Sequence, residues 1–148
     1  MEDERTCCQR EEQWRDLEPF PGYQVSNLSR IKRAVGGRGA KAGRILKPFN
    51  YGGRKSQHLA VLLPMPADGQ LPLGLRPKGN ASTTKTHRAF MIARLVAWAW
   101  VSDGRPTGVD LPKVVDHKDQ DPLHCCDTNL QWLYFRQHLR KHHKKEDQ

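Results

Sequence analysis

The apolar residues of this chain come in short runs broken by Pro and Gly, and this feature most limits the folds open to it. The clearest run is MIARLVAWAWV at residues 91–101. Its apolar side chains recur at helical spacing, at Ile92, Leu95, Val96, Ala99 and Trp100. Since hydrophobic residues make up only 36% of the 148 residues, we expect one small core to which this helix contributes its apolar stripe.

Before that helix, apolar and polar residues alternate over short stretches, which is typical of short strands. Such stretches occur at residues 23–31, 44–49 and 58–63, and a further strand is expected at 86–90. Residues 64–84 are rich in Pro and Gly and offer little to bury. We therefore predict an exposed loop there, and favour an insertion without a function of its own.

After a Gly/Pro break, the last third predicts the order strand, loop, strand, helix. The segments are a strand over 112–117, a loop over 118–128, a strand within 129–135 and a basic helix over 135–145. We expect Phe135 and Leu139 on the buried side of that helix, and Trp132 in the small core beside it. Trp98 and Trp100 are expected to serve packing in the earlier helix.

These elements predict the fold class α+β, with a small N-terminal antiparallel β module, a helix, and a C-terminal strand–strand–helix unit. We divide the chain into a flexible leader at 1–12, a β-rich module at 13–85 and a C-terminal domain at 86–148. The first residues, MEDERTCCQREEQW, are charged and lack a secretory signal, and no apolar run reaches the roughly 18 residues of a membrane span. The expectation is an intracellular protein without membrane contact.

The positive charge of the chain requires a partner or a large hydrated surface. Lys and Arg number 25 against 16 Asp and Glu, a net charge of +9. One basic cluster spans residues 30–47 and another spans 136–145. Such clusters favour binding to the phosphates of nucleic acid over a merely solvated basic face. The cysteines form two adjacent pairs, Cys7–Cys8 and Cys125–Cys126, and we interpret all four as reduced thiols.

The C-terminal unit places ionisable groups at short intervals. Asp116 and His117 end a predicted strand, and His138 and His142 lie four apart on the predicted helix, where they share a face. If the hairpin folds onto the helix, one carboxylate and one or two imidazoles form a hydrolytic divalent-metal site, with His117 as general base. Asn129 is placed to hydrogen-bond across the loop. A solvated His-rich tail is the alternative for each histidine taken singly.

The segment VVDHKDQDPLHCCDTNLQWLYFRQH resembles the active-site segment of the HNH endonucleases, the ββα-metal nucleases, with His117, Asn129 and His138 in the order of the motif. Upstream, EQWRDLEPFPGYQVSNLSRIKR and GRILKP resemble the N-terminal module commonly fused to HNH homing endonucleases of phages. IARLVAWAW resembles that family's HRLVAEAF helix. Four departures stand in the chain. Ala93 replaces the usual His, Ser29 and Gln120 stand where Gly is common, and His124–Cys125 occupies a loop position where Asn is preferred.

The resemblance implies a metal-dependent nuclease of the phage homing type that hydrolyses double-stranded DNA, by nicking or double-strand cleavage, in the cytoplasm of a bacterial host. Asp116, His138 and His142 would bind the metal, most plainly Mg²⁺, with Mn²⁺ and Zn²⁺ as alternatives. His117 would deprotonate water, and Asn129 would orient the loop and His117. The expected DNA-binding residues are Arg30, Lys32, Arg33, Arg44, Lys47, Arg94, Lys118 and Arg136.

Two other functions stay open on the sequence. The first is a DNA-binding protein that keeps the nuclease scaffold without cleaving. The second is a structural zinc module with ligands from His124, Cys125, Cys126 and His138, although their spacing fits the usual tetrahedral sites poorly. The sequence leaves open whether the protein is a monomer or a dimer.

Overall fold

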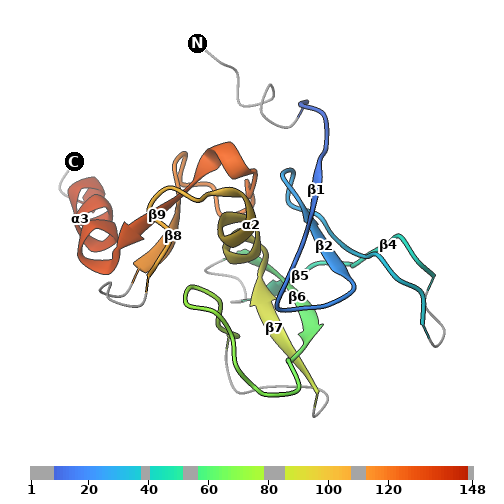
Figure 1. Ribbon diagram of the computed structural model, residues 1–148. Helices are drawn as coiled ribbons and strands as arrows, with labels where there is room; N and C mark the ends of the chain where they lie inside the picture. Colours follow the sequence, from blue (N-terminus) through green and yellow to red (C-terminus); the bar gives the residue numbers. More distant parts are fainter. Residues whose placement is uncertain (1–8, 38–40, 52–56, 79–85, 108–112, 147–148) are drawn as a thin grey trace.

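The computed structural model describes residues 9–37, 41–51, 57–78, 86–107 and 113–146, with side chains described as far as Lys141. Its first sheet is antiparallel, in the order β1-β2-β3-β4. These strands span Trp14–Asp16, Tyr23–Ser26, Ile31–Arg33 and Arg44–Ile45. In Figure 1 the β3–β4 ribbon projects from one side of the molecule. The predicted flexible leader is described only from residue 9, and there Arg10 forms an ion pair with Asp127.

The second sheet has the order β5-β6-β7, with strands at Phe49–Tyr51, His58–Pro64 and His87–Met91. The predicted strand at 44–49 is therefore wrong in one respect: it is divided between two sheets. Pro48 lies at the break, and proline cannot donate to a strand ladder. The strands expected at 58–63 and 86–90 are confirmed and pair with each other. The boundary that we predicted after residue 85 thus falls between two paired strands.

Helix α2, Ile92–Trp100, confirms the helix expected from the apolar spacing. Leu95, Val96 and Ala97 are fully buried at its centre. The helix packs against β2, β6 and β7 and also against the C-terminal hairpin, so one core joins both halves of the chain. Trp100 donates its indole N–H to the carbonyl of Val25 at 3.2 Å, as expected for a packing residue.

The Pro/Gly-rich segment is less exposed than we predicted from its composition. Leu75 is buried in the core, at 4% exposure. The neighbouring Gly74 carbonyl accepts a hydrogen bond from the Arg94 guanidinium at 2.8 Å, and the Lys78 amide donates to the Ala89 carbonyl at 2.9 Å. These contacts, with Met65 and Leu71 packed against the core, attach the described part of this segment to α2 and β7.

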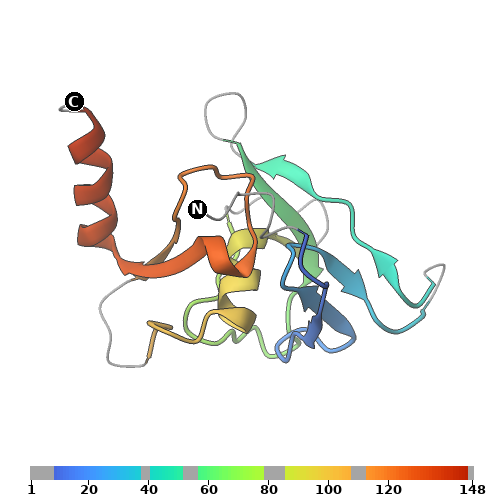
Figure 2. The ribbon, with the colours of Figure 1, turned by 90° about the horizontal axis from the view of Figure 1, so that it is seen from above.

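The C-terminal unit has the expected order. Strand β8 spans Lys113–His117 and pairs antiparallel with β9, Leu130–Tyr134. The short 3₁₀ helix η1, Asp127–Asn129, directly precedes β9, and helix α3, Phe135–Glu146, directly follows it. Trp132 is buried and donates its indole N–H to the Val101 carbonyl at 3.0 Å, which confirms its core position. Figure 2 shows α3 extending from the end of the hairpin, away from the rest of the molecule.

The buried face expected for α3 is wrong. Phe135 is 51% exposed and Leu139 is 41% exposed. The helix faces the hairpin with polar side chains instead, because His138 and Lys141 both approach the buried carboxylate of Asp116. Within the described residues, no helix combines the length and the apolar character needed to cross a bilayer.

Candidate functional site

A cavity of about 680 Å³ lies between the C-terminal unit and the second sheet. One wall carries Asp116 and His117, from the end of β8, and His138, from α3. The facing wall includes His58 from β6 and Lys78, so both halves of the chain contribute to it. His117 is the last residue of β8, pairs with Leu130, the first residue of β9, and lines the cavity.

Asp116 is the most enclosed ionisable group of the cavity, at 2% exposure. Its Oδ2 accepts hydrogen bonds from Lys141 Nζ at 2.6 Å and from Gln131 Nε2 at 2.8 Å. Its Oδ1 lies 3.4 Å from Nδ1 of His138. Burial acts to raise the pKa of Asp116, but the hydrogen bonds and charge of Lys141 and the bond from Gln131 outweigh it and leave that pKa below its usual value. Asp116 is therefore a carboxylate at neutral pH.

The pair Asp116 and His138 suits a divalent cation. Bonds of about 2.0–2.1 Å place two neighbouring ligands of a tetrahedral or octahedral ion about 3.0–3.4 Å apart. The observed distance from Oδ1 to Nδ1, 3.4 Å, falls at the end of that range. A carboxylate with an imidazole is also a usual donor set for a hydrolytic metal with open positions for water.

No third ligand joins this pair in the described part of the chain. Among those residues, no group of three or more His, Cys, Asp and Glu side chains is placed to bind one ion. The zinc module with ligands His124, Cys125, Cys126 and His138 consequently lacks its ligand set. His142 lies within α3, but its side chain is outside the described residues. Cys125 and Cys126 are both buried, at 2% exposure, and Cys7 and Cys8 lie outside the described residues.

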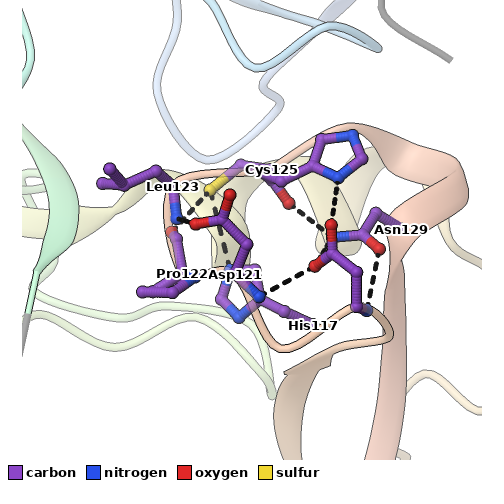
Figure 3. A network of polar contacts seen from close by, with 8 residues as sticks. His117, Asp121, Pro122, Leu123, Cys125 and Asn129 are labelled. Atoms are coloured by element: carbon purple, nitrogen blue, oxygen red, sulfur yellow. Dashed lines mark hydrogen bonds and ion pairs between the residues drawn. The ribbon is translucent and has the colours of Figure 1, made fainter. Parts of the chain in front are cut away.

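His117 is held from the loop that follows β8. Its Nε2 lies 3.7 Å from Sγ of Cys125, and that thiol lies 3.4 Å from the Pro122 carbonyl, to which it can donate (Figure 3). Burial raises the pKa of Cys125 to about 12, so the thiol keeps its proton. Burial and the nearby His58 lower the pKa of His117, despite opposing effects of nearby carboxylates. His117 is thus a neutral imidazole at neutral pH.

Asn129 ties the two ends of the same loop together. Its side-chain oxygen accepts from the Asp119 amide at 3.1 Å, and its Nδ2 donates to Asp119 Oδ1 at 2.9 Å and to the His124 carbonyl at 2.7 Å (Figure 3). The Lys118 amide donates to the Asn129 carbonyl at 2.7 Å. Because His124 directly precedes Cys125, these bonds fix the backbone that brings the Cys125 thiol to His117.

The two residues that stand where Gly is common are explained by backbone geometry. Ser29 has φ of 69° and Gln120 has φ of 65°. They are the non-glycine residues with positive φ in the described part of the chain. This left-handed conformation is one that glycine adopts without strain. Both turns therefore keep the geometry of a glycine turn with another residue in place.

The expected DNA-binding residues fall into separate groups. The first group comes from β3, β4, the turn before β3 and the link after β4, and consists of Arg30, Lys32, Arg33, Arg44 and Lys47. The β3–β4 ribbon and α3 lie at opposite ends of the molecule in both ribbon views (Figures 1 and 2), so this ribbon, which carries Lys32, Arg33 and Arg44, lies far from α3.

The remaining three expected DNA-binding residues belong to the second half of the chain. Lys118 and Arg136 are exposed. Arg94 lines the cavity and is half-buried. Burial and the nearby Arg76 lower its pKa, and its guanidinium donates to the Gly74 carbonyl. Arg94 therefore has a structural contact in addition to its place in the cavity wall.

Sequence reasoning missed three contributors. Lys141 follows His138 by three residues on a helix, a spacing that places both on one face, and this signal was available. Cys125 carried none, because its contact with His117 depends on the fold of the loop. His58 comes from the N-terminal half, and its ring centre lies 6.4 Å from that of His117. Only the packing of the second sheet against the hairpin brings the two together.

The sequence matches neither the profile of a known protein family nor a curated protein. Among solved structures, the fold is similar to that of the HNH homing endonuclease I-HmuI, described for its DNA binding and cleavage, with a TM-score of 0.58 and 21% sequence identity. The match covers 90% of this chain and 59% of that one, so this chain spans less than two thirds of that protein. At this identity the likeness establishes the fold, which is of the α+β kind seen in an HNH endonuclease.

Proposed function

We propose that this chain is a metal-dependent DNA endonuclease of the HNH type, which hydrolyses phosphodiester bonds. The observation that carries the proposal is the approach of Asp116 Oδ1 to His138 Nδ1, 3.4 Å apart, beside the neutral imidazole of His117 on the wall of one cavity. The fold that this chain shares with I-HmuI, a DNA-cleaving protein, supports the same activity.

Asp116 and His138 would hold the cation, with Mg²⁺ the first choice and Mn²⁺ or Zn²⁺ also suited to a carboxylate and an imidazole. His142 remains a candidate third ligand. When bound, the ion would stabilise negative charge on the phosphate and on the leaving oxygen. Asp116 meets the requirement for a charged ligand because Lys141 and Gln131 keep its pKa low.

His117 would act as the general base. The Cys125 thiol can direct its proton to Pro122, so its sulfur accepts from His117 Nε2–H and leaves the lone pair of the ring on Nδ1. Nδ1 would take a proton from water as the water oxygen attacks phosphorus and the bond to the 3′ oxygen breaks. The leaving 3′ oxygen would take a proton from a second water molecule of the solvent, so the products would carry 5′-phosphate and 3′-hydroxyl ends. Asn129 would position His117 through the loop.

The substrate would be double-stranded DNA. Arg30, Lys32, Arg33, Arg44 and Lys47 would contact phosphates away from the cavity, whereas Lys118, Arg136 and Arg94 would act near it. The half-buried Lys32 and Arg33 lie on β3, and the exposed Arg44 lies on the neighbouring β4, so two adjacent strands of this sheet carry positive charge. A phage homing enzyme acting in the bacterial cytoplasm is the setting that agrees with the sequence resemblance.

The test is cleavage of supercoiled plasmid with Mg²⁺ or Mn²⁺ by the wild type, His117→Ala and Asp116→Asn. His87→Ala is the matched control, because His87 begins β7 and does not line the cavity. We expect cleavage that EDTA abolishes, and a loss of about 10²–10⁴-fold in rate for His117→Ala. The His87 variant should cut at the wild-type rate. Sequencing the product ends then checks for 5′-phosphate.

DNA binding without cleavage is the competing function, favoured by the basic first sheet alone. It predicts that the wild type retards a DNA duplex but leaves plasmid intact with every metal. It also predicts that His117→Ala binds DNA as the wild type does. Cleavage that persists in both the His117 and Asp116 variants would instead contradict the proposed site.

A further inference from the structure

Lys141 is a positively charged side chain in direct contact with Asp116, one of the two proposed metal ligands. Its ammonium lies 2.6 Å from Oδ2 of Asp116, a carboxylate that is 2% exposed. A buried carboxylate needs a compensating charge, because water is not available to solvate it. Lys141 supplies that charge, and Gln131 adds a neutral hydrogen bond at 2.8 Å.

A second cation on the same carboxylate would meet repulsion from this ammonium. Asp116 carries one negative charge, which Lys141 already balances. A divalent ion placed between Oδ1 and His138 would lie a few ångströms from the ammonium, in an enclosed site where screening by water is weak. Metal binding therefore favours departure of the Lys141 side chain from Asp116.

Lys141 is able to leave. Its side chain is 27% exposed, compared with 3% for that of Asp116, and its ammonium ends a flexible four-carbon stem. It stands on the same face of α3 as His138, which lines the cavity. If nucleic acid is bound at the cavity, its phosphate oxygens would offer the displaced ammonium a new anionic partner.

We propose that Lys141 is an exchangeable counter-ion, which neutralises Asp116 in the metal-free protein and passes to a DNA phosphate when a divalent cation takes over that carboxylate. This inference rests on the proposed nuclease function. It makes metal weakly held without DNA, and it couples the two ligands, since each favours the state of Lys141 that the other requires.

The experiment measures Mn²⁺ binding to the DNA-free protein by calorimetry and electron paramagnetic resonance. Lys141→Met keeps the stem and removes the charge, and Lys141→Arg keeps the charge. Arg140→Met is the matched control, because it removes a positive charge from the adjacent, exposed position of α3. We expect Lys141→Met to bind Mn²⁺ at least tenfold more tightly than the wild type, with the other two variants close to the wild type.

A second measurement is the affinity for a DNA duplex, with EDTA and with Mn²⁺. Saturating Mn²⁺ should strengthen binding by the wild type more than binding by Lys141→Met. If Lys141→Met folds poorly by circular dichroism, Lys141→Gln serves in its place. Unchanged or weaker Mn²⁺ affinity in the charge-removing variant would overturn the inference.

The inference and the proposed function fail in different ways. If the wild type cuts DNA, Asp116→Asn does not, and Lys141→Met leaves Mn²⁺ affinity unchanged, only the counter-ion inference is wrong. If neither the wild type nor Lys141→Met binds Mn²⁺ or cuts DNA, both are wrong.

Discussion

Two turns of this molecule are built alike, and each is held by a buried asparagine: the first turn is residues 27–30, between β2 and β3, and the second turn is residues 118–129, between β8 and β9. Asn27 is 4% exposed and Asn129 is 7% exposed. The Asn27 side-chain oxygen accepts from the Gln13 amide at 2.8 Å, just as that of Asn129 accepts from the Asp119 amide at 3.1 Å. Each turn also contains a residue in the left-handed region, Ser29 in one and Gln120 in the other.

The two turns differ in what surrounds them. In the first, the Ser26 hydroxyl accepts from the Leu28 and Arg30 amides, and the ion pair of Arg30 with Glu12 lies on the surface. In the second, the loop holds Cys125 against His117. The Asp127 amide donates to the Asn27 carbonyl at 3.1 Å, so the turns also touch. The comparison indicates that the same buried asparagine arrangement supports the fold in the first turn and holds Cys125 against His117 in the second.

The largest expected effect separates the two asparagines. Asn27→Ala and Asn129→Ala should each lower the free energy of unfolding by about 1–3 kcal/mol, because each leaves a buried backbone group without its partner. Only Asn129→Ala should also slow DNA cleavage, by about 10²-fold or more, since it frees the loop that holds His117. Urea denaturation and single-turnover cleavage at a temperature where both variants are folded measure the two effects.

Equal loss of cleavage in both variants would break the comparison. It would mean that the first turn also controls the site, through the contact of Asp127 with Asn27. Cleavage by Asn129→Ala at the wild-type rate would show that the loop positions His117 without this side chain.

The sequence predicted those parts of the fold that local patterns control. The apolar spacing of α2 and the alternation in β6 and β7 depend on neighbours in the chain, and these elements are confirmed. It failed where burial depends on distant partners. Leu75 is buried from within a Pro/Gly-rich segment because α2 and β7 cover it, and Phe135 is exposed because α3 turns His138 and Lys141 toward Asp116.

The same distinction applies to the candidate site. Asp116, His117 and His138 were predicted from their spacing, and the structure brings them to one cavity. Their roles in catalysis and metal binding stay predictions. Lys141, Cys125 and His58 reach them through tertiary contacts, which residue spacing alone does not specify.

The next prediction concerns acid stability, which should depend on Asp119 in the second turn. Burial acts to raise the pKa of Asp119, but hydrogen bonds from His124, the Asp121 backbone and Asn129 outweigh it and lower that pKa. A lowered folded pKa stabilises the protein above the unfolded value, near pH 4, and this stability is lost as the pH falls through the folded value. Asp119→Asn should cost about 1–2 kcal/mol at pH 7 and much less at pH 3.

Urea denaturation across this pH range measures the difference between Asp119→Asn and the wild type. A difference that stays constant from pH 7 to pH 3 would assign the loss to shape rather than to charge. Asp68→Asn, which makes the same substitution on an exposed turn away from Asn129, provides the control.

A smaller effect tests the left-handed residues. Ser29→Gly and Gln120→Gly should each stabilise the protein by about 0.5–1 kcal/mol, because relief of the left-handed strain exceeds the added entropy of the unfolded glycine chain. Both gains should be similar if the turns are equivalent. Thermal unfolding of the two variants and of the double variant measures them, and a loss of stability in either would contradict the assigned strain.

The smallest expected effect belongs to the surface pair of the first turn. The hydrogen bond from Arg30 is the main cause that lowers the pKa of Glu12, but the Arg30 side chain is 53% exposed, and water and salt screen the pair. Glu12→Gln should therefore lower the free energy of unfolding by at most about 0.5 kcal/mol at low salt, and by nothing measurable at about 0.5 M NaCl. Double-mutant cycles with Arg30→Met measure the coupling. The same cycle on Asp119 and His124 gives the coupling free energy of the second turn. An equally large coupling for Glu12 and Arg30 would mean that the first turn also depends on charge, and the two turns would then not differ in this respect.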